Sequence, residues 1–178
     1  MRRGSALLWA VVLVLIGALA SAGAQEASVR TEPIASRAVA NVPSPVRRAM
    51  TIEVARIIGA DERASHYRRS DRWHRLDLDG DGQDEWMVVY AIEGFGGGNN
   101  YAQYLTTFRY VEPVWFAFET HGVGGKGSLA VDGDVMSYIS GQSLIFPAMA
   151  YDEDDPMCCP SVDVSVEVSI GIGGALQF

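Results

Sequence analysis

Cysteine is scarce in this chain of 178 residues: Cys158 and Cys159 are the only two, and they are adjacent. Two neighbouring cysteines cannot join distant parts of a chain, so the sequence excludes a disulfide framework. The composition, with 48% hydrophobic and 10% aromatic residues, is that of a globular protein. Packing must therefore stabilise the fold, with a bound ion as a further candidate.

The apolar run near the start of the chain is short. Arg2 and Arg3 precede an apolar run over 6–16, and small residues follow up to Ala24. This order is typical of a secretory signal peptide over 1–24, and the run is about half of the ~20 residues that a membrane-spanning helix needs. No cysteine lies near the cleavage point to carry a lipid anchor. We therefore expect a periplasmic or secreted protein with no transmembrane segment after cleavage.

Basic residues are rare in the second part of the chain. After residue 75 there are two, Arg109 and Lys126, against sixteen acidic residues, whereas 25–75 carries ten arginines against six acidic residues. Without its signal peptide the chain has a net charge of −10. Either the basic segment neutralises the acidic body, or it forms a basic face for an anionic partner. The compartment and the overall charge disfavour nucleic acid, so we expect an unknown envelope or extracellular partner.

Catalytic motifs are missing. The chain has no G-x-S-x-G, H-E-x-x-H or C-x-x-C pattern. The glycine-rich stretches "GFGGGN" and "GVGGKGS" do not match the spacing of nucleotide-binding loops, and we interpret them as hairpin loops. An acid pair drawn from Glu93, Glu112 or Glu119 could in principle hydrolyse a glycosidic bond, but nothing in the sequence selects one. We therefore expect a protein that is not an enzyme.

The chain has no internal repeat, and its length after cleavage suits one domain. Residues 25–44 mix small and polar residues, so we predict a flexible leader there and a single domain over 45–178. One amphipathic helix is predicted over 45–58, with Ser44 as its capping residue and Gly59 at its end.

After Trp73 the chain breaks into short segments rich in aromatic and β-branched residues, which predict strands. The clearest is 162–172, where Val and Ile occupy even positions and polar residues mainly odd ones, as in a strand with one buried face. Hairpin-length links favour an α+β fold, in which the N-terminal helix packs on a mostly antiparallel, curled or sandwich-like sheet. The predicted strands lie within 72–78, 85–94, 101–112, 114–122, 134–140, 142–151 and 161–172.

Five acidic side chains crowd into "DLDGDGQDE", residues 77–85. Calcium loops take carboxylates from alternate residues and a backbone carbonyl at the seventh position, and they bend sharply at a glycine. Counted from Asp77, the spacing of this stretch fits that scheme. The predicted calcium ligands are Asp77, Asp79, Asp81, Gln83 and Glu85.

A polar hairpin turn without a metal is the alternative for this stretch, because Asp-Gly pairs form turns unaided. An EF-hand is excluded, since Val88 stands where that motif needs a bidentate Glu. Over 77–92 the chain resembles the calcium loop of FG-GAP repeats, the integrin-type propeller repeats, with Glu85 in place of the usual Asp. The resemblance implies calcium as the cofactor.

The cysteine pair follows an acidic run in "DEDDPMCCPS". A bond between the two neighbours, two free thiols and links to another chain are all open. Nearby carboxylates disfavour a reactive thiolate. A thiol-redox or copper-handling protein using Cys158 and Cys159, with Met157 and the three histidines as further ligands, is the alternative to a calcium-binding protein.

The segment D-P-M-C-C-P-S and the glycine-rich stretches resemble those of LppP/LprE-type exported bacterial proteins, over roughly 70–178. This chain lacks the lipidated cysteine of the lipoproteins in that group. The resemblance implies an exported α+β domain and supplies no reaction. Together these features predict an exported calcium-binding module with a non-catalytic binding or envelope-associated role.

Overall fold

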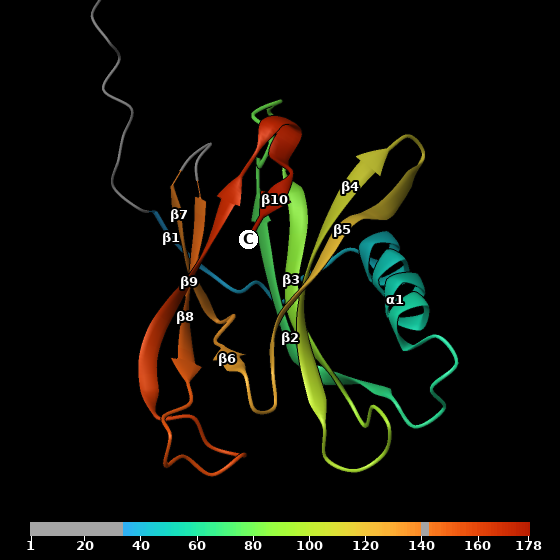
Figure 1. Ribbon diagram of the computed structural model, residues 1–178. Coiled ribbons are helices and arrows are strands. Elements are labelled where there is room, and N and C mark those ends of the chain that lie inside the picture. Colours follow the sequence, from blue (N-terminus) through green and yellow to red (C-terminus); the bar gives the residue numbers. More distant parts are fainter. Residues whose placement is uncertain (1–33, 140–142) are drawn as a thin grey trace, which may run out of the picture.

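The computed structural model describes residues 34–139 and 143–178, which form two antiparallel β-sheets and one α-helix (Figure 1). The small sheet has the order β2-β3-β4-β5, and the large sheet has the order β1-β7-β8-β9-β10 with β6 also paired to β8. The described chain is mostly β-sheet, and the predicted antiparallel pairing with one helix is confirmed.

The small sheet consists of β2 (Ser65–Leu76), β3 (Glu85–Glu93), β4 (Tyr101–Val111) and β5 (Val114–Gly125). The large sheet consists of β1 (Ile34–Arg37), β6 (Leu129–Val131), β7 (Val135–Ile139), β8 (Ser143–Ala150), β9 (Val162–Ile170) and β10 (Leu176–Gln177). The helix is α1 (Ser44–Ile58), and a short 3-10 turn, η1 (Ile172–Gly174), precedes β10.

The elements stack in three layers, with the small sheet in the middle (Figure 1). One core lies between α1 and the small sheet and contains Val46, Met50 and Val54 of the helix. A second core lies between the two sheets and contains Leu144 and Phe146 of β8. The two cores share the small sheet as their common wall.

Strand β3 is buried on both of its faces. Trp86 and Val88 belong to the core beneath α1, whereas Met87 and Val89 belong to the core between the sheets. A strand covered on both sides has no face that must be polar, which explains why "EWMVVYAIE" shows no alternation. Burial of each large apolar side chain contributes about 1.5–3 kcal/mol, so β3 is central to the stability of both cores.

Helix α1 begins and ends much as predicted, but its cap differs. Pro43 occupies the capping position and no side chain caps the helix, so the prediction that Ser44 is the cap is wrong. Ser44 instead lies in the first turn, followed by Pro45, whose missing N–H is tolerated there. Gly59 ends the helix in a positive-φ conformation (φ 57°), and its N–H donates to the carbonyl of Ala55.

A chain of buried and partly buried hydrogen bonds links α1 to the small sheet. The hydroxyl of Thr120 donates to Glu53 Oε1 at 2.5 Å, and Thr106 lies 2.9 Å from Thr120 and 3.1 Å from the hydroxyl of Tyr90. The guanidinium of Arg56 bonds both oxygens of Glu53 and lowers the pKa of that carboxyl, against the effect of burial. The buried carboxylate of Glu53 therefore has hydrogen-bond partners for both of its oxygens.

Of the leader predicted for 25–44, residues 34–44 are described and 25–33 lie outside the described residues. β1 pairs with β7 from Ile34 opposite Tyr138 to Arg37 opposite Val135, and the N–H of Val39 donates to the carbonyl of Trp73 in β2 at 2.7 Å. The described part of this segment pairs through its backbone with both sheets, and composition does not report such pairing. The signal peptide predicted for 1–24 lies outside the described residues.

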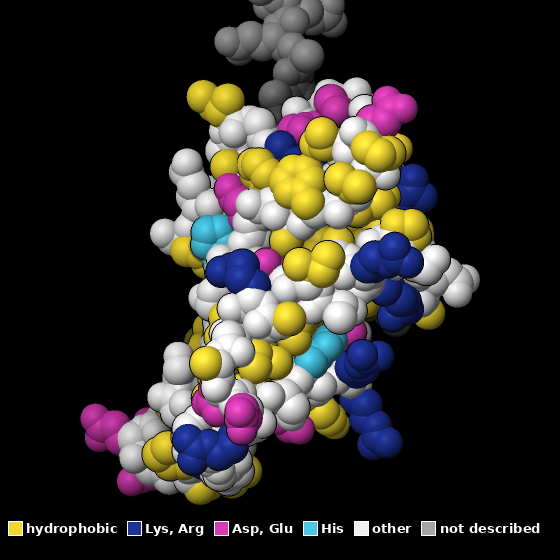
Figure 2. Space-filling view, turned by 90° about the vertical axis from the view of Figure 1, so that its right-hand side faces the viewer, with side chains coloured by type: hydrophobic (Ala, Val, Ile, Leu, Met, Phe, Trp, Pro, Cys, Tyr) yellow, Lys and Arg dark blue, Asp and Glu magenta, His cyan; other side chains and the backbone are white. Residues whose placement is uncertain are grey.

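Several large apolar side chains are exposed around the β4–β5 hairpin and on α1. Ile52 is 67% exposed, Val111 and Val114 are each 57% exposed, and Tyr110 is 48% exposed. Figure 2 views this side of the molecule and shows apolar side chains gathered in its upper half, with most Lys and Arg side chains lower down. Within 34–139 and 143–178, no helix has the length and hydrophobicity that crossing a membrane requires.

Candidate metal site

The acidic loop, residues 77–84, connects β2 to β3 just beyond their last pair, Leu76 with Glu85. The loop folds around Asp77, whose two carboxylate oxygens accept the N–H groups of Gly80 at 2.8 Å and Gly82 at 3.0 Å. Both glycines have a positive φ, 78° and 87°, which other residues rarely adopt. The Asp-Gly pairs of the sequence therefore place the first carboxylate inside the loop.

Three carboxylates meet at the base of this loop. Asp77, Asp79 and Glu85 each offer one oxygen, and these oxygens all lie within 4.8 Å of one another. Calcium binds oxygens at about 2.3–2.6 Å, so two of its ligands are separated by at most about 5 Å. The spacing and the all-oxygen donor set fit a hard divalent cation.

Glu85 is the most buried carboxylate of the set, with 6% of the residue exposed. The N–H of Leu78 donates to its Oε2 at 2.8 Å. Burial raises the pKa of Glu85, and the neighbouring Asp79 and Asp81 raise it further, while the hydrogen bond from Leu78 and the charge of Arg109 lower it. A cation bound among these groups would favour the charged form of Glu85.

The structure brings together three of the five predicted ligands. Asp81 and Gln83 are exposed on the outer part of the loop, where Asp81 Oδ1 accepts the N–H of Gln83 at 2.7 Å. Asp84, the remaining acidic residue, forms an ion pair of 2.9 Å with Arg75. The outer part of the loop is therefore closed by its own hydrogen bonds, and the cluster forms at its base.

Arg109 also lies at this cluster, and no motif in the sequence assigns it there. From β4 its Nη1 lies 3.5 Å from Asp79 Oδ2, its Nη2 bonds the carbonyl of Gly173, and its guanidinium carbon lies 3.8 Å from the centre of the Phe118 ring. A side chain at Gly174 would come within 2.5 Å of Arg109 Nη2 and within 3.2 Å of the backbone N of Asp79. The signals in the sequence are the scarcity of basic residues after position 75 and the paired glycines of "GIGG".

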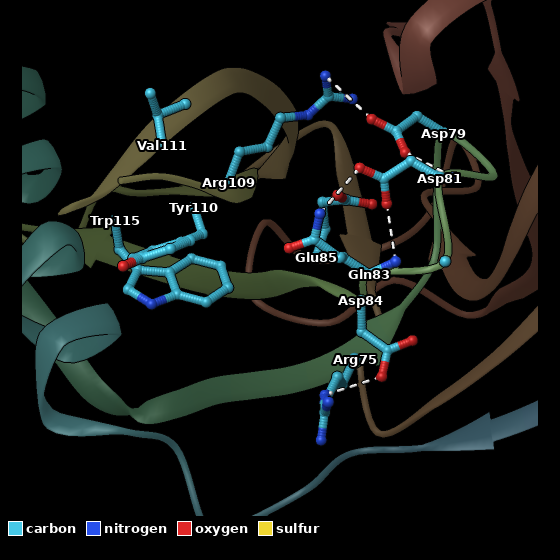
Figure 3. A pocket seen from close by; sticks show the side chains of 11 residues that line it. Arg75, Asp79, Asp81, Gln83, Asp84, Glu85, Arg109, Tyr110, Val111 and Trp115 are labelled. Atoms are coloured by element: carbon cyan, nitrogen blue, oxygen red, sulfur yellow. Dashed lines mark hydrogen bonds and ion pairs between the residues drawn. The ribbon is translucent and has the colours of Figure 1, made fainter. Parts of the chain in front are cut away.

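An open cleft of about 630 Å³ separates the acidic loop from the β4–β5 hairpin. The cleft forms because β3 begins only at Glu85, whereas β4 continues to Val111 and the hairpin projects past it. Figure 3 shows the carboxylates on one wall, Tyr110 and Trp115 on the opposite wall, and Arg109 reaching across to Asp79. The candidate metal site therefore lies next to open space.

Cys158 and Cys159 form a disulfide with each other and are exposed in the loop between β8 and β9. This loop is closed by Asp155, whose Oδ2 accepts the N–H groups of Asp152 and Ser161, each at 2.8 Å. Of the three states that the sequence left open, the structure has the bond between neighbours.

The histidines are bound at other places in the described chain. His66 contacts Asp71 at 2.7 Å, and His121 lies 3.4 Å from Glu119. His74 is buried, with its Nε2 donating to the carbonyl of Gly133 at 2.8 Å. Within the described residues, the His, Cys, Asp and Glu side chains that gather as a possible metal site are the acidic ones, and no histidine joins the cysteine pair in such a group.

The glutamates considered for hydrolysis do not form a pair either. Glu93 ends β3, whereas Glu112 lies in the turn between β4 and β5, at the other end of the small sheet. Glu119 accepts the N–H of Leu176 at 2.7 Å.

Comparisons of the chain with protein-family models, curated proteins and solved structures found no match. The functional interpretation rests on the geometry of the residues themselves.

Proposed function

We propose that the protein is an exported calcium-binding module with a non-catalytic, envelope-associated role. The observation that supports it is the convergence of carboxylate oxygens from Asp77, Asp79 and Glu85 within 4.8 Å at the start of a buried strand. The side chain of Asp81 and the backbone carbonyl of Gln83 are the further ligands in this proposal. Calcium would supply the positive charge that this cluster of like charges needs.

Calcium suits the site better than other common metals. The donors are all oxygens, which excludes the soft metals that prefer sulfur and nitrogen. Magnesium prefers near-ideal octahedral geometry with several retained waters, whereas calcium accepts six to eight oxygens in flexible arrangements. Outside the cell calcium is abundant, so a dissociation constant of ~10⁻⁴ to 10⁻³ M is sufficient for occupancy.

The proposed ion also has a structural role. Asp79 is held by Arg109 of β4, and Arg109 in turn bonds Gly173 of η1. An ion on Asp79 and Glu85 therefore connects the β2–β3 hairpin, the small sheet and the C-terminal segment. We class the fold as α+β because α1 and the small sheet share a core, and the proposed LppP/LprE-type relationship rests on the sequence segments alone.

Calorimetric titration of the chelator-treated protein with calcium tests this proposal. We expect one saturable site with a dissociation constant of about 1 mM or tighter, lost in Asp79→Asn. Absence of any saturable heat would contradict it.

A thiol-redox function is the second candidate, because the Cys158–Cys159 disulfide is exposed and therefore open to reductants. Mass measurement after treatment with reduced glutathione, with and without copper(I), tests it. Ready reduction and retention of copper by the dithiol would support this function, and an unchanged mass would remove it.

A further inference from the structure

A second hollow, of about 690 Å³, lies on the small sheet and has no part in the proposed calcium site. It is lined by residues of β2, β3 and β4 and by the loop that joins β3 to β4. The acidic loop precedes β3 and this loop follows it, so the two sites lie at opposite ends of the strand (Figure 1). Its volume falls in the range of about 300–1,000 Å³ that is usual for small-molecule sites.

The strand register builds the hollow. Tyr67 of β2, Ala91 of β3 and Gln103 of β4 lie opposite one another in one row, and the next row on the same face contains Glu93 and Tyr101. The small side chain of Ala91 leaves a depression between larger neighbours. Tyr67 and Tyr101 stand diagonally across it, and we call it the Tyr67–Tyr101 hollow.

The wall and floor of the hollow are held in place. The register of β2 shifts after Tyr67, and in this bulge the hydroxyl of Ser70 accepts the N–H of Ala91 and donates to the carbonyl of Tyr67, both at 2.7 Å. The amide of Gln103 is bound at both ends by the backbone of Val131, at 2.8 Å and 3.0 Å. These groups therefore shape the hollow and are not its free donors.

The rim is formed by the glycine-rich loop, which packs on Arg63. A side chain at Gly94 would come within 2.3 Å of the carbonyl of Arg63, and one at Gly97 within 3.1 Å of its guanidinium. The N–H of Gly96 donates to Asp61 at 2.8 Å, which ties the loop to the segment after α1. The rim is thus ordered before any ligand arrives, which lowers the entropic cost of binding.

The groups that line the hollow combine aromatic rings with planar polar side chains. Tyr67 is 43% exposed and the side chain of Arg63 is 68% exposed, and Glu93 and Asn99 are exposed as well. Arg63 pairs with Asp61 at 3.7 Å, and Lys126 donates to the side-chain oxygen of Asn99. Together with Glu93, two positive and two negative charges surround the hollow, so the site favours a neutral ligand. A purely apolar ligand would cover these polar groups without offering them new hydrogen bonds.

We propose that the Tyr67–Tyr101 hollow binds a neutral saccharide. A sugar ring presents C–H groups on its face, which pack on an aromatic ring, and hydroxyls at its edge, which bond to carboxylate, amide and guanidinium groups. Tyr67 supplies the ring, and Glu93, Asn99 and Arg63 supply the polar groups. The ligand is either a free oligosaccharide or the end of a longer glycan.

Titration of the isotope-labelled protein with cellotetraose, chitotetraose and maltotetraose, followed by backbone amide NMR, tests the proposal. We expect at least one of them to give saturable shifts centred on Ala91, Tyr101 and the glycine-rich loop, with a dissociation constant on the order of 1 mM. Tyr67→Ala should weaken this binding about tenfold, because ring stacking is lost. Tyr110→Ala, which removes a similarly exposed tyrosine at the far end of the sheet, should not change it.

The same titration with phenol and with tetragalacturonate separates the possible ligands. Shifts from phenol as large as those from the best sugar would overturn the proposal in favour of an apolar ligand, and a preference for tetragalacturonate would overturn neutrality. No saturable shift from any of the three neutral sugars, or shifts that Tyr67→Ala leaves intact, would also overturn it. A tetrasaccharide that binds is then compared with a glycan polymer of the same sugar. Binding of the tetrasaccharide alone indicates a free oligosaccharide as the ligand, and binding of both indicates the end of a longer glycan. Because the calcium site lies at the other end of β3, a chelator should leave sugar binding unchanged whether or not calcium binds.

Discussion

Removal of calcium should lower the melting temperature of this protein by a calculable amount. At about a hundredfold excess over its dissociation constant, a ligand that binds the folded state alone adds about 2.7 kcal/mol to the free energy of unfolding. For a domain of this size each kcal/mol shifts the melting temperature by about 2–4 °C. Thermal melting in excess calcium and then in excess chelator should therefore differ by about 5–11 °C.

Variants of the acidic loop make this measurement specific. Asp79→Asn removes a carboxylate from the cluster, and Asp81→Asn removes the next one along the loop, so the calcium-dependent shift should be lost when both are changed. Asp84→Asn is the matched control, since Asp84 lies in the same loop but pairs with Arg75 at the surface. An exposed pair contributes about 0–1 kcal/mol, so this control should retain the full shift.

Two results would refute the reasoning. Equal melting temperatures in calcium and in chelator would mean that the acidic loop is a solvated turn. A shift that Asp79→Asn and Asp81→Asn leave intact would mean that calcium binds at another place, of which the exposed acidic run before Cys158 is the first to test. Magnesium at the same concentration should produce a smaller shift, because the cluster does not impose octahedral geometry.

Three further predictions concern stability. Burial lowers the pKa of His74 below its ordinary value of 6.5, so the folded state binds fewer protons than the unfolded state. The free energy of unfolding should therefore decline as the pH falls below about 6.5. His74→Gln should flatten this decline in a series of melts, and an unchanged slope would exclude His74 as its source. Thr120→Val should cost about 1–2 kcal/mol in urea denaturation because it leaves Glu53 short of a donor, and combination with Glu53→Gln should cost less than the sum of the two, so strict additivity would argue against their hydrogen bond. Val88→Ala should cost about 2 kcal/mol, whereas Val162→Ala, at a position 39% exposed, should cost about 0.5 kcal/mol or less; equal losses would contradict the burial of β3.

Periodic segments were predictable from the sequence, and short ones were not. β9 is found where alternation of Val with polar residues predicts it, and its odd positions are exposed. β1, β6 and β10 contain two to four residues each, which is too short for periodicity to show, and they exist because a neighbouring strand offers hydrogen bonds. Propensity alone cannot report a partner that lies far along the chain.

The candidate metal site was likewise predictable from the sequence only in part. Asp77, Asp79 and Glu85 lie within one stretch, so their spacing alone indicated a cluster. Arg109 and Gly174 reach this cluster through the register of β4 and the course of η1. Contacts between such distant positions depend on the tertiary fold, and no local pattern encodes them.

The burial of β3 on both faces has a mechanical consequence. A slip of one residue would exchange the bulky set that includes Trp86 and Tyr90 with the smaller set that includes Val89 and Ala91, and both cores would be misfilled at once. Packing on both faces therefore fixes the register of β3, and the strand acts as a rigid spacer. The six residue steps from Glu85 to Ala91 hold the acidic loop and the floor of the Tyr67–Tyr101 hollow about 20 Å apart. A polymer that touches both ends must span that length, and motion at one end cannot be absorbed by sliding of the strand.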